Sequence, residues 1–123
     1  PAKEAPTEQD FTKTITPDPV LLFRYSALTY NGHRIHYDRT YATEEELYSA
    51  LVVHGPLLVT LLLELQRDNL ADNTLKKFKF RAVRPTFDNK AFTVSGKRDG
   101  NALSLWSADQ SNALCMTVKA ELS

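Results

Sequence analysis

The stretch PLLVTLLLELQRDNLAD, which begins at Pro56, constrains the fold of this chain more than any other. Pro56 suits the first turn of a helix, helix-forming residues follow it, and Asp72-Asn73 close the segment. From Leu57 to Leu65 the segment is apolar nearly all round, whereas a helix on a protein surface would show a polar stripe. The pattern therefore predicts a helix that is buried on most of its sides.

After this helix the hydrophobic pattern changes to a period of two, which is typical of strands. The four strand-like runs are LKKFKFRAV, AFTVSGKR, ALSLWSA and ALCMTVKAEL. Residues 98–101 and 109–112 favour tight turns and therefore predict hairpins between the later runs. An antiparallel sheet wrapped around one apolar helix accounts for both halves of the pattern, and this α+β arrangement is the hot-dog fold.

Two shorter helices are predicted ahead of the buried one. Asp18 is a good helix cap, and Pro19 fits the first helical position. Thr43, with Glu46 three residues later, has the pattern of a capping box. The two helices would flank the polar loop YNGHRIHYD, which begins at Tyr30.

Residues 1–16 are polar and have little to bury, so we expect a flexible arm or linker ahead of a hot-dog domain over residues 17–123. The chain begins at Pro1 without a methionine, which fits a processed product or a piece of a longer protein. No signal peptide is recognisable, and the longest apolar run is too short to span a bilayer. A cytoplasmic setting is expected, or a mitochondrial one in a eukaryote.

The charge and the cysteine content exclude several classes of function. Fifteen basic residues balance fifteen acidic ones, so the chain has no overall attraction for nucleic acid or an anionic membrane. Five cations between Leu75 and Arg84 are typical of the solvated face of a strand. Cys115 is the only cysteine, which excludes an internal disulfide and a cysteine-rich zinc site. Its apolar neighbours indicate a small core residue rather than a nucleophile.

The loop YNGHRIHYD supplies the first candidates for chemistry. His36 can take a proton from water and return one near neutral pH. Asn31 can hold a water or a carbonyl group but cannot exchange protons. His33 is expected to be structural. A metal site built from His33, His36, Asp38 and His54 has no supporting motif, so no metal is expected.

The stretch VVHGPLL supplies the second candidate. Gly55 lies at the entrance of the buried helix, where the first N–H groups lack intrahelical partners and the helix dipole is positive. Glycine lets a ligand approach the backbone closely, and Pro56 has no N–H to donate. The Gly55 amide is therefore a natural donor to a carbonyl oxygen that becomes negative during a reaction. The alternative is that Gly55 only turns a strand into a helix, with His54 orienting the turn.

Together these segments resemble the MaoC-like branch of hot-dog enzymes, the (R)-specific enoyl-thioester hydratases and 3-hydroxyacyl-thioester dehydratases. The catalytic His of that family matches His36, its Asp matches Asn31, and its His-Gly pair matches His54-Gly55. The longer stretches LLFRYSALTYNGHRIHYD and FKFRAVRP are similar to one subgroup, the fungal mitochondrial-type dehydratases and the bacterial mesaconyl-CoA and itaconyl-CoA hydratases. In that subgroup the matching region is often the C-terminal half of a double hot-dog chain.

The resemblance implies an enzyme that adds or removes water across the double bond of an enoyl thioester. The thioester carbonyl would lie against the Gly55 N–H, and His36 would deprotonate the attacking water. Because Asn31 replaces the family's Asp, a mechanism with two bases cannot be copied, and Asn31 is expected to position the water. No cofactor is expected, since CoA or pantetheine arrives as part of the substrate. The expected partner is a second hot-dog unit, as a homodimer or as the other half of a double hot-dog protein.

Four further residues are expected to bind substrate: Tyr30, Arg34, His54 and Arg84. An arginine matches a carboxylate with two parallel hydrogen bonds, so a dicarboxylic acyl group such as mesaconyl would call for one. The same cations could hold the phosphates of CoA. The alternative for each arginine is a surface role or a structural salt bridge.

Two other interpretations stay open. A hot-dog thioesterase commonly uses a carboxylate at the central helix, and no Asp or Glu lies between Tyr48 and Thr60. A non-catalytic hot-dog unit that stabilises a partner would lack the His and Gly pair, which this chain has at His36 and Gly55. The hydratase is therefore the favoured function.

Overall fold

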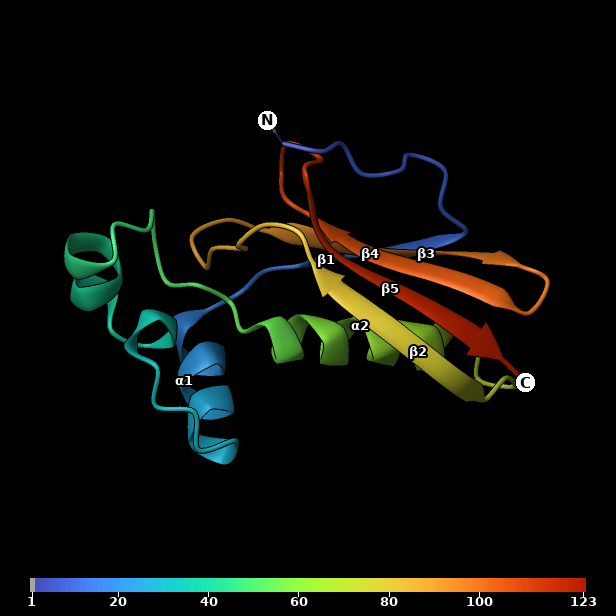
Figure 1. Cartoon of the computed structure of the whole chain (residues 1–123), viewed down its shortest axis with the longest axis horizontal. Coiled ribbons are helices and arrows are strands. Elements are labelled where there is room, and N and C mark those ends of the chain that lie inside the picture. The colour runs from blue at the N-terminus through green and yellow to red at the C-terminus, as the bar shows by residue number, and fades with distance from the viewer. Residues whose placement is uncertain (1) are drawn as a thin grey trace.

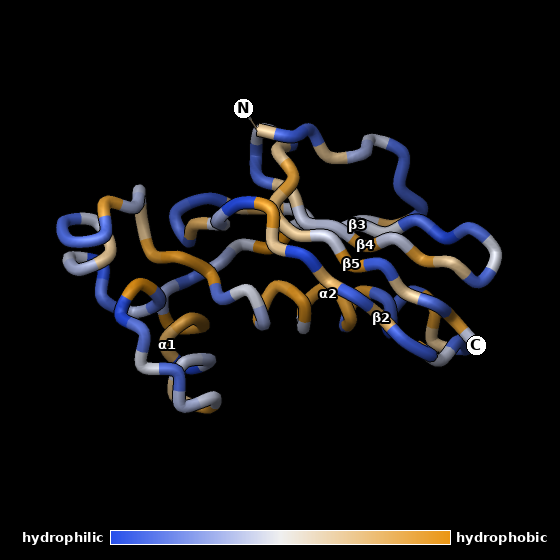
Figure 2. The backbone as a smooth tube through the Cα atoms, in the orientation of Figure 1, coloured by the Kyte–Doolittle hydropathy of each residue, from blue (hydrophilic) through white to orange (hydrophobic). Residues whose placement is uncertain are grey.

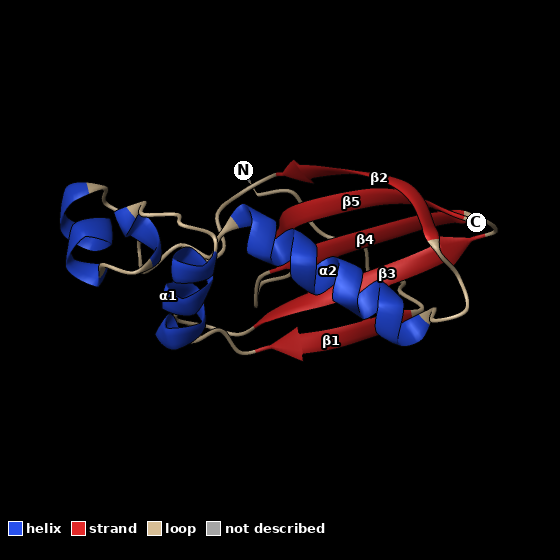
Figure 3. Cartoon of the chain, turned by 90° about the horizontal axis from the view of Figure 1, so that it is seen from below, coloured by secondary structure: helices blue, strands red, loops and turns tan. Residues whose placement is uncertain are grey.

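The computed structural model of the chain describes residues 2–123, so Pro1, the first residue of the predicted arm, lies outside the described part. A five-stranded antiparallel sheet packs one face against a long helix, α2 (Gly55–Asn69). Figures 1 and 3 show α2 lying over this face, with the shorter helical segments gathered beyond its N-terminal end. This is the hot-dog arrangement that the sequence predicts.

The four strand-like runs all form strands, as predicted. They are β2 (Leu75–Ala82), β3 (Phe92–Asp99), β4 (Ala102–Ala108) and β5 (Leu114–Leu122). With the additional strand β1 (Phe11–Ile15), the order across the sheet is β1-β3-β4-β5-β2. The two predicted hairpin turns place Gly100 at φ 61° and Asn112 at φ 60°, a left-handed conformation that these residue types tolerate well.

The N-terminal segment differs from the prediction of a flexible arm through residue 16. Phe11–Ile15 pair with β3 at one edge of the sheet, and the N–H of Ala5 donates to the carbonyl oxygen of Asn112 at 2.9 Å. The prediction is wrong for Phe11–Ile15 because the three central residues of this strand are exposed and give no apolar signal. Gly96 permits the pairing, since a Cβ there would collide with the ring of Phe11.

The helices before the site agree with the sequence only in part. Helix α1 (Pro19–Leu28) begins as predicted, and the Asp18 carboxylate accepts a hydrogen bond from the N–H of Leu21 at 2.9 Å. The predicted capping box at Thr43 is wrong, because Thr43 lies inside a wide helical turn, η2 (Tyr41–Glu45). Its hydroxyl donates back to the carbonyl oxygen of Arg39 at 2.8 Å instead of capping a helix.

Helix α2 is buried over most of its circumference, as predicted. Leu62 is fully buried, and Figure 2 shows the hydrophobic turns of α2 under the sheet. On the opposite face Thr60, Glu64 and Arg67 are exposed. These exposed residues form a narrow stripe, and Leu61 and Leu63 beside it still pack against the core. Cys115 is fully buried, as expected of a core residue.

Candidate active site

The loop that carries His36 ends in a short 3-10 turn, η1 (Arg34–His36). The His36 side chain is largely buried, and its Nδ1 lies 2.6 Å from the carbonyl oxygen of Val52. A carbonyl oxygen only accepts, so Nδ1 must carry the hydrogen. The neutral ring therefore presents a bare Nε2, which is the atom a general base needs.

Backbone pairing holds this turn against the segment that leads into α2. The N–H of Val52 donates to the carbonyl oxygen of Ile35 at 2.9 Å, and the N–H of Val53 donates to that of Thr86 at 2.8 Å. Val52 also forms an isolated antiparallel bridge with Phe87. Ile35, which precedes His36, is thus bonded to Val52, whose carbonyl oxygen fixes the His36 ring.

A buried carboxylate clamps the same segment. The Asp88 side chain is 1% exposed and accepts two hydrogen bonds from the Arg39 guanidinium, at 3.1 and 2.7 Å. It also accepts one from the N–H of Leu51 at 3.1 Å. Arg39 follows the His36 turn and Leu51 precedes Val52, so Asp88 joins both sides of the site. A buried carboxylate is stable only when it is paired with a positive charge and both of its oxygens accept hydrogen bonds, as they do here.

His54 brings the two sequence motifs together. Its ring stacks on that of His36, with centroids 3.9 Å apart and planes 19° from parallel. Its Nε2 lies 2.7 Å from the hydroxyl oxygen of Ser26 on α1. His54 was expected to contact substrate, but its side chain is fully buried. It lies behind His36 because the turn before α2 folds the ring into the core.

Both stacked histidines are held in the neutral form. Burial lowers the pKa of His36; the Val52 carbonyl opposes this shift and the neighbouring His33 adds to it. Burial, and then the proximity of His36, lowers the pKa of His54 to about 4. Near neutral pH the site therefore contains an uncharged His36, the protonation state that a base requires.

The buried His54 makes stability depend on pH. Its pKa is about 4 in the folded protein and about 6.5 in an unfolded chain. The unfolded state therefore binds more protons in this window, and the stability gained from the neutral ring is present above about pH 6.5 and lost as the pH falls towards 4. We expect the free energy of unfolding, measured in urea, to fall across this window. The fall should be smaller in His54→Phe, and equal slopes in the two proteins would contradict the assignment.

Gly55 is the first residue of α2, directly after His54. Among the described residues no hydrogen-bond acceptor is recorded for its N–H, as expected at a helix N-terminus. A Cβ added at Gly55 would meet only the Met116 side chain, at an ordinary 3.8 Å. Gly55 lines a pocket of about 280 Å³. The other residues that line it include Val52, Leu58, Val83, Arg84, Thr86, Cys115 and Met116.

Asn31 and Tyr30 line a different pocket of about 320 Å³, to which Ser26 and Tyr37 also contribute. The side-chain oxygen of Asn31 accepts a hydrogen bond from the N–H of His33 at 3.1 Å, and Tyr30 is 96% exposed. Neither His36 nor Gly55 lines this pocket, so a role of Asn31 beside His36 stays a prediction.

The two arginines expected at the substrate differ in their surroundings. Arg34 pairs with Asp38 at 2.8 Å and lies over the Tyr41 ring, 4.2 Å from its centroid. The hydrogen bond from Arg34 lowers the pKa of Asp38, whose carboxylate also accepts from the Tyr41 N–H. Arg84 is exposed at the rim of the pocket that contains Gly55. Of the two, only Arg84 shares a pocket with a predicted catalytic residue.

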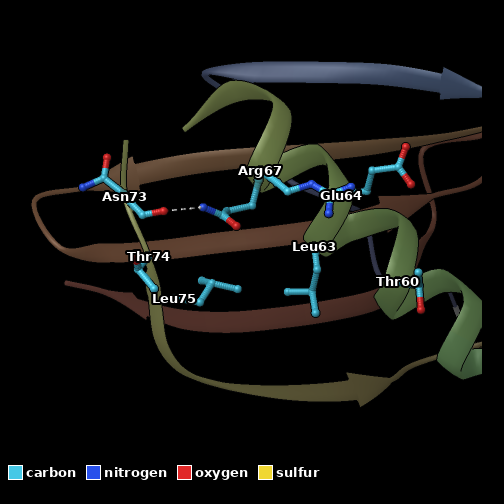
Figure 4. Close-up of a pocket in the computed structure, with 8 residues that line it drawn as sticks. Thr60, Leu63, Glu64, Arg67, Asn73, Thr74 and Leu75 are labelled. Carbon is cyan, nitrogen blue, oxygen red and sulfur yellow. Dashed lines mark hydrogen bonds between the residues drawn. The ribbon is translucent and has the colours of Figure 1, made fainter. Parts of the chain in front are cut away.

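A larger groove of about 490 Å³ lies along the far part of α2, where Figure 4 shows Leu63 and Leu75 facing each other. Its lining on α2 begins at Thr60, roughly 8 Å along the helix from Gly55 at the usual rise per residue. Its lining residues contain no histidine or cysteine: Thr60, Leu63, Glu64, Gln66, Arg67, Asn73, Thr74 and Leu75. This groove is therefore separate from the candidate site.

Sequence reasoning missed the groups that hold His36 in place. Ser26 lies on a helix 28 residues before its partner His54, and nothing in the surrounding sequence marks it. The Arg39–Asp88 pair spans 49 residues. Such long-range partners carry no local pattern, so only the tertiary structure reveals them.

The described residues lack two further kinds of feature. In residues 2–123 no group of three or more His, Cys, Asp or Glu side chains is placed to hold a metal ion. No helix in the same part of the chain has the length and apolar composition needed to cross a bilayer.

Known proteins resemble this chain in sequence. The chain is 43% identical to the mesaconyl-C(4)-CoA hydratase of Chloroflexus aurantiacus over 99% of this chain and 43% of that protein. It is 45% identical to the mitochondrial hydroxyacyl-thioester dehydratase type 2 of Schizosaccharomyces pombe, over 74% of this chain and 30% of that protein. The chain thus spans less than half the length of either relative.

Solved structures agree on the fold. The (R)-hydratase from A. caviae involved in PHA biosynthesis superposes with a TM-score of 0.76 at 20% identity, over 95% of this chain and 96% of that one. A MaoC-like dehydratase from Phytophthora capsici gives a TM-score of 0.79 at 12% identity, over 99% of this chain and 44% of that one. The model of one family, hydroxyacyl-thioester dehydratase type 2, matches residues 1–88. This chain therefore belongs to that family, within the MaoC-like hot-dog hydratases and dehydratases.

Proposed function

We propose that this chain adds water to, or removes it from, the double bond of an enoyl thioester. The observation that carries the proposal is the placement of His36, with a bare Nε2, against the segment that ends in the Gly55 N–H. Membership of the family supports the same chemistry. The proposal includes the expected cytoplasmic setting, or a mitochondrial one in a eukaryote, since the S. pombe relative is named as mitochondrial.

Hydration then proceeds as follows. The thioester carbonyl accepts a hydrogen bond from the Gly55 N–H, which polarises the double bond. Nε2 of His36 takes a proton from water as the water oxygen bonds to the β-carbon, and the electron pair of the double bond moves towards the carbonyl oxygen. The imidazolium returns its proton to the α-carbon, so one water is added overall. Acid–base catalysis of this kind contributes about 10²–10⁴-fold, and one oxyanion donor about 3 kcal/mol.

The remaining candidate residues are assigned to binding. We propose that Asn31 holds the water through its amide nitrogen, because its oxygen already accepts from His33. Arg84 lines the pocket of Gly55 and suits a carboxylate on the acyl group, as in mesaconyl-CoA. Tyr30 and Arg34, which are exposed, are proposed to contact the CoA part of the substrate. No cofactor beyond the substrate's own CoA or pantetheine is needed.

The test is to mix the protein with crotonyl-CoA and, separately, with mesaconyl-CoA and to follow the loss of enoyl absorbance. Hydration of either substrate supports the proposed reaction, and a preference for mesaconyl-CoA that Arg84→Ala removes supports the carboxylate contact. Release of free CoA without hydration would identify a thioesterase instead. If a folded protein leaves both substrates unchanged, the chain acts as a non-catalytic unit or needs its partner.

Gly55→Ala is expected to fold normally and to lose about 10- to 100-fold in kcat/KM, on the scale of a misplaced reacting group. The added methyl group has room inside the protein, and we expect it to hinder the close approach of a carbonyl oxygen to the N–H. Thermal unfolding and steady-state hydration rates check the two halves of this prediction. Thr60→Ala, on the exposed face of the same helix, is the matched control and should keep the wild-type rate.

We propose a second hot-dog unit as the partner, bound at β2. This strand is at the edge of the sheet, where its outer N–H and C=O groups are unpaired. Phe78 and Phe80 lie two residues apart, on one face of the strand, and are 42% and 57% exposed. Sedimentation of this chain should give a dimer that Phe80→Lys dissociates. A wild-type monomer would leave the other half of a longer chain as the partner.

A further inference from the structure

His54 is the buried group that the proposed reaction does not use. Its side chain is fully buried, and its Nδ1 has no hydrogen-bond partner among the described residues. Leaving a buried polar atom unpaired costs about 1–3 kcal/mol, a loss that a phenylalanine of similar shape would avoid. Filling space is therefore not a sufficient reason for a histidine here.

The ring of His54 is held in one orientation by contacts on three sides. One face stacks on His36 at 3.9 Å. The Tyr25 ring meets it at an angle of 63°, with centroids 4.7 Å apart. The Ser26 hydroxyl oxygen lies 2.7 Å from Nε2. Tyr25 and Ser26 are consecutive residues of α1, so this helix serves as the support against which His54 rests.

His36 is in turn fixed by His54 and by one hydrogen bond. Its Nδ1–H donates to the carbonyl oxygen of Val52 at 2.6 Å, and one of its faces rests on His54. A half-turn of the His36 ring would break the hydrogen bond, and a smaller rotation would break the stack. The two contacts therefore determine where Nε2 points.

The stack also requires an uncharged partner. Two further titratable groups meet the two stacked rings: His33 approaches the His36 ring edge-on at 5.6 Å, and Tyr25 lies against His54. A cation at His54 would repel the imidazolium that forms on His36 during proton transfer. Burial keeps the pKa of His54 at about 4, so this repulsion is absent near neutral pH.

We propose that His54 is a positioning residue for proton transfer at His36, and that Ser26 is the anchor that holds His54 in place. The first half of this proposal rests on the proposed hydratase reaction. The backbone of His54 continues directly into Gly55, so the same residue sets the direction of the base and the start of the helix that carries the N–H donor.

Three variants and one control test the proposal. His54→Ala removes the stack, His54→Phe keeps an aromatic ring but loses the Ser26 bond, and Ser26→Ala removes the anchor alone. Ser107→Ala is the control, because Ser107 is a fully buried serine on β4 that lines neither the Gly55 pocket nor the Asn31 pocket. The measurements are kcat, KM and thermal unfolding, together with the nitrogen NMR signals of the His36 ring, which report its tautomer and its hydrogen bond.

We expect His54→Ala to lower kcat by about 10- to 100-fold with little change in KM, as for a reacting group displaced by about an ångström. The NMR signals of the His36 nitrogens should shift towards a mixture of tautomers. His54→Phe and Ser26→Ala should lower kcat by smaller factors, and Ser107→Ala should keep the wild-type kcat and the wild-type His36 signals.

A folded His54→Ala with wild-type kcat and unchanged His36 signals would overturn the proposal. If His54→Ala fails to fold, His54→Phe and Ser26→Ala decide in its place, and wild-type kcat with unchanged signals in both would overturn it equally. A merely structural role would lower the unfolding temperature and leave the His36 signals of the folded protein as in wild type. If the wild type hydrates neither substrate, the proposed function fails, while the NMR comparison still decides whether His54 fixes His36.

Discussion

Replacing His36 by alanine is expected to slow enoyl-thioester hydration by about 10²–10⁴-fold, the usual contribution of a general acid–base group. The variant loses the bare Nε2 that the structure places beside the Val52–Gly55 segment. The fold should survive, because His36 lies on a short turn outside the sheet and α2. Steady-state rates with crotonyl-CoA and mesaconyl-CoA, alongside circular dichroism, measure both effects.

The same loop provides the control for this experiment. His33 is an exposed histidine three residues earlier, with no hydrogen bond from its ring to the described residues. His33→Ala is expected to keep most of the wild-type rate. If both variants lose activity equally, the loop as a whole rather than the His36 ring carries the effect, and the assignment of the base would be wrong.

Replacing Asp88 by alanine is expected to lower the free energy of unfolding by about 3 kcal/mol, the lower end of what breaking a buried ion pair costs. The carboxylate is 1% exposed and accepts hydrogen bonds from Arg39 and from the Leu51 N–H. The loss is at the lower end because Arg39 is 49% exposed and can be solvated by water when its partner is removed. Urea titration of the free energy of unfolding measures the effect.

An exposed ion pair provides the comparison for Asp88. Asp38 pairs with Arg34 on the surface, four residues apart, and its removal should cost no more than about 1 kcal/mol. Asp88→Ala should also lower the hydration rate, since it loosens the segment whose Val52 carbonyl fixes His36. Equal losses of stability in Asp38→Ala and Asp88→Ala would contradict the role of Asp88 as a clamp.

Most of the fold was predictable because its signals are local. A period of two marks β2 to β5, the residues at the two hairpin turns tolerate φ near 60°, and Asp18-Pro19 mark the start of α1. The failures have different causes. Phe11–Ile15 became an edge strand because its partner β3 is distant in the sequence. Thr43 lies within a helical turn, where its hydroxyl bonds to the Arg39 carbonyl oxygen instead of capping a helix.

The candidate site was predictable only to the level of residue type. His36 and Gly55 stand out because a loop imidazole and a glycine before proline suit proton transfer and a free N–H donor. His54 was expected to touch substrate, yet it is buried behind His36. The role of Asn31 remains a prediction, since it lines a different pocket from Gly55.

The sequence by itself determined the hot-dog architecture and the chemical groups available to the site, since both depend on residue type and on spacing along the chain. Only the tertiary structure decided how those groups work together. The tautomer of His36 depends on a carbonyl 16 residues away, and the position of His54 depends on a serine 28 residues away. A hydrogen bond or a ring stack requires atoms to meet within about 4 Å, and chain segments this far apart meet only when the core has packed.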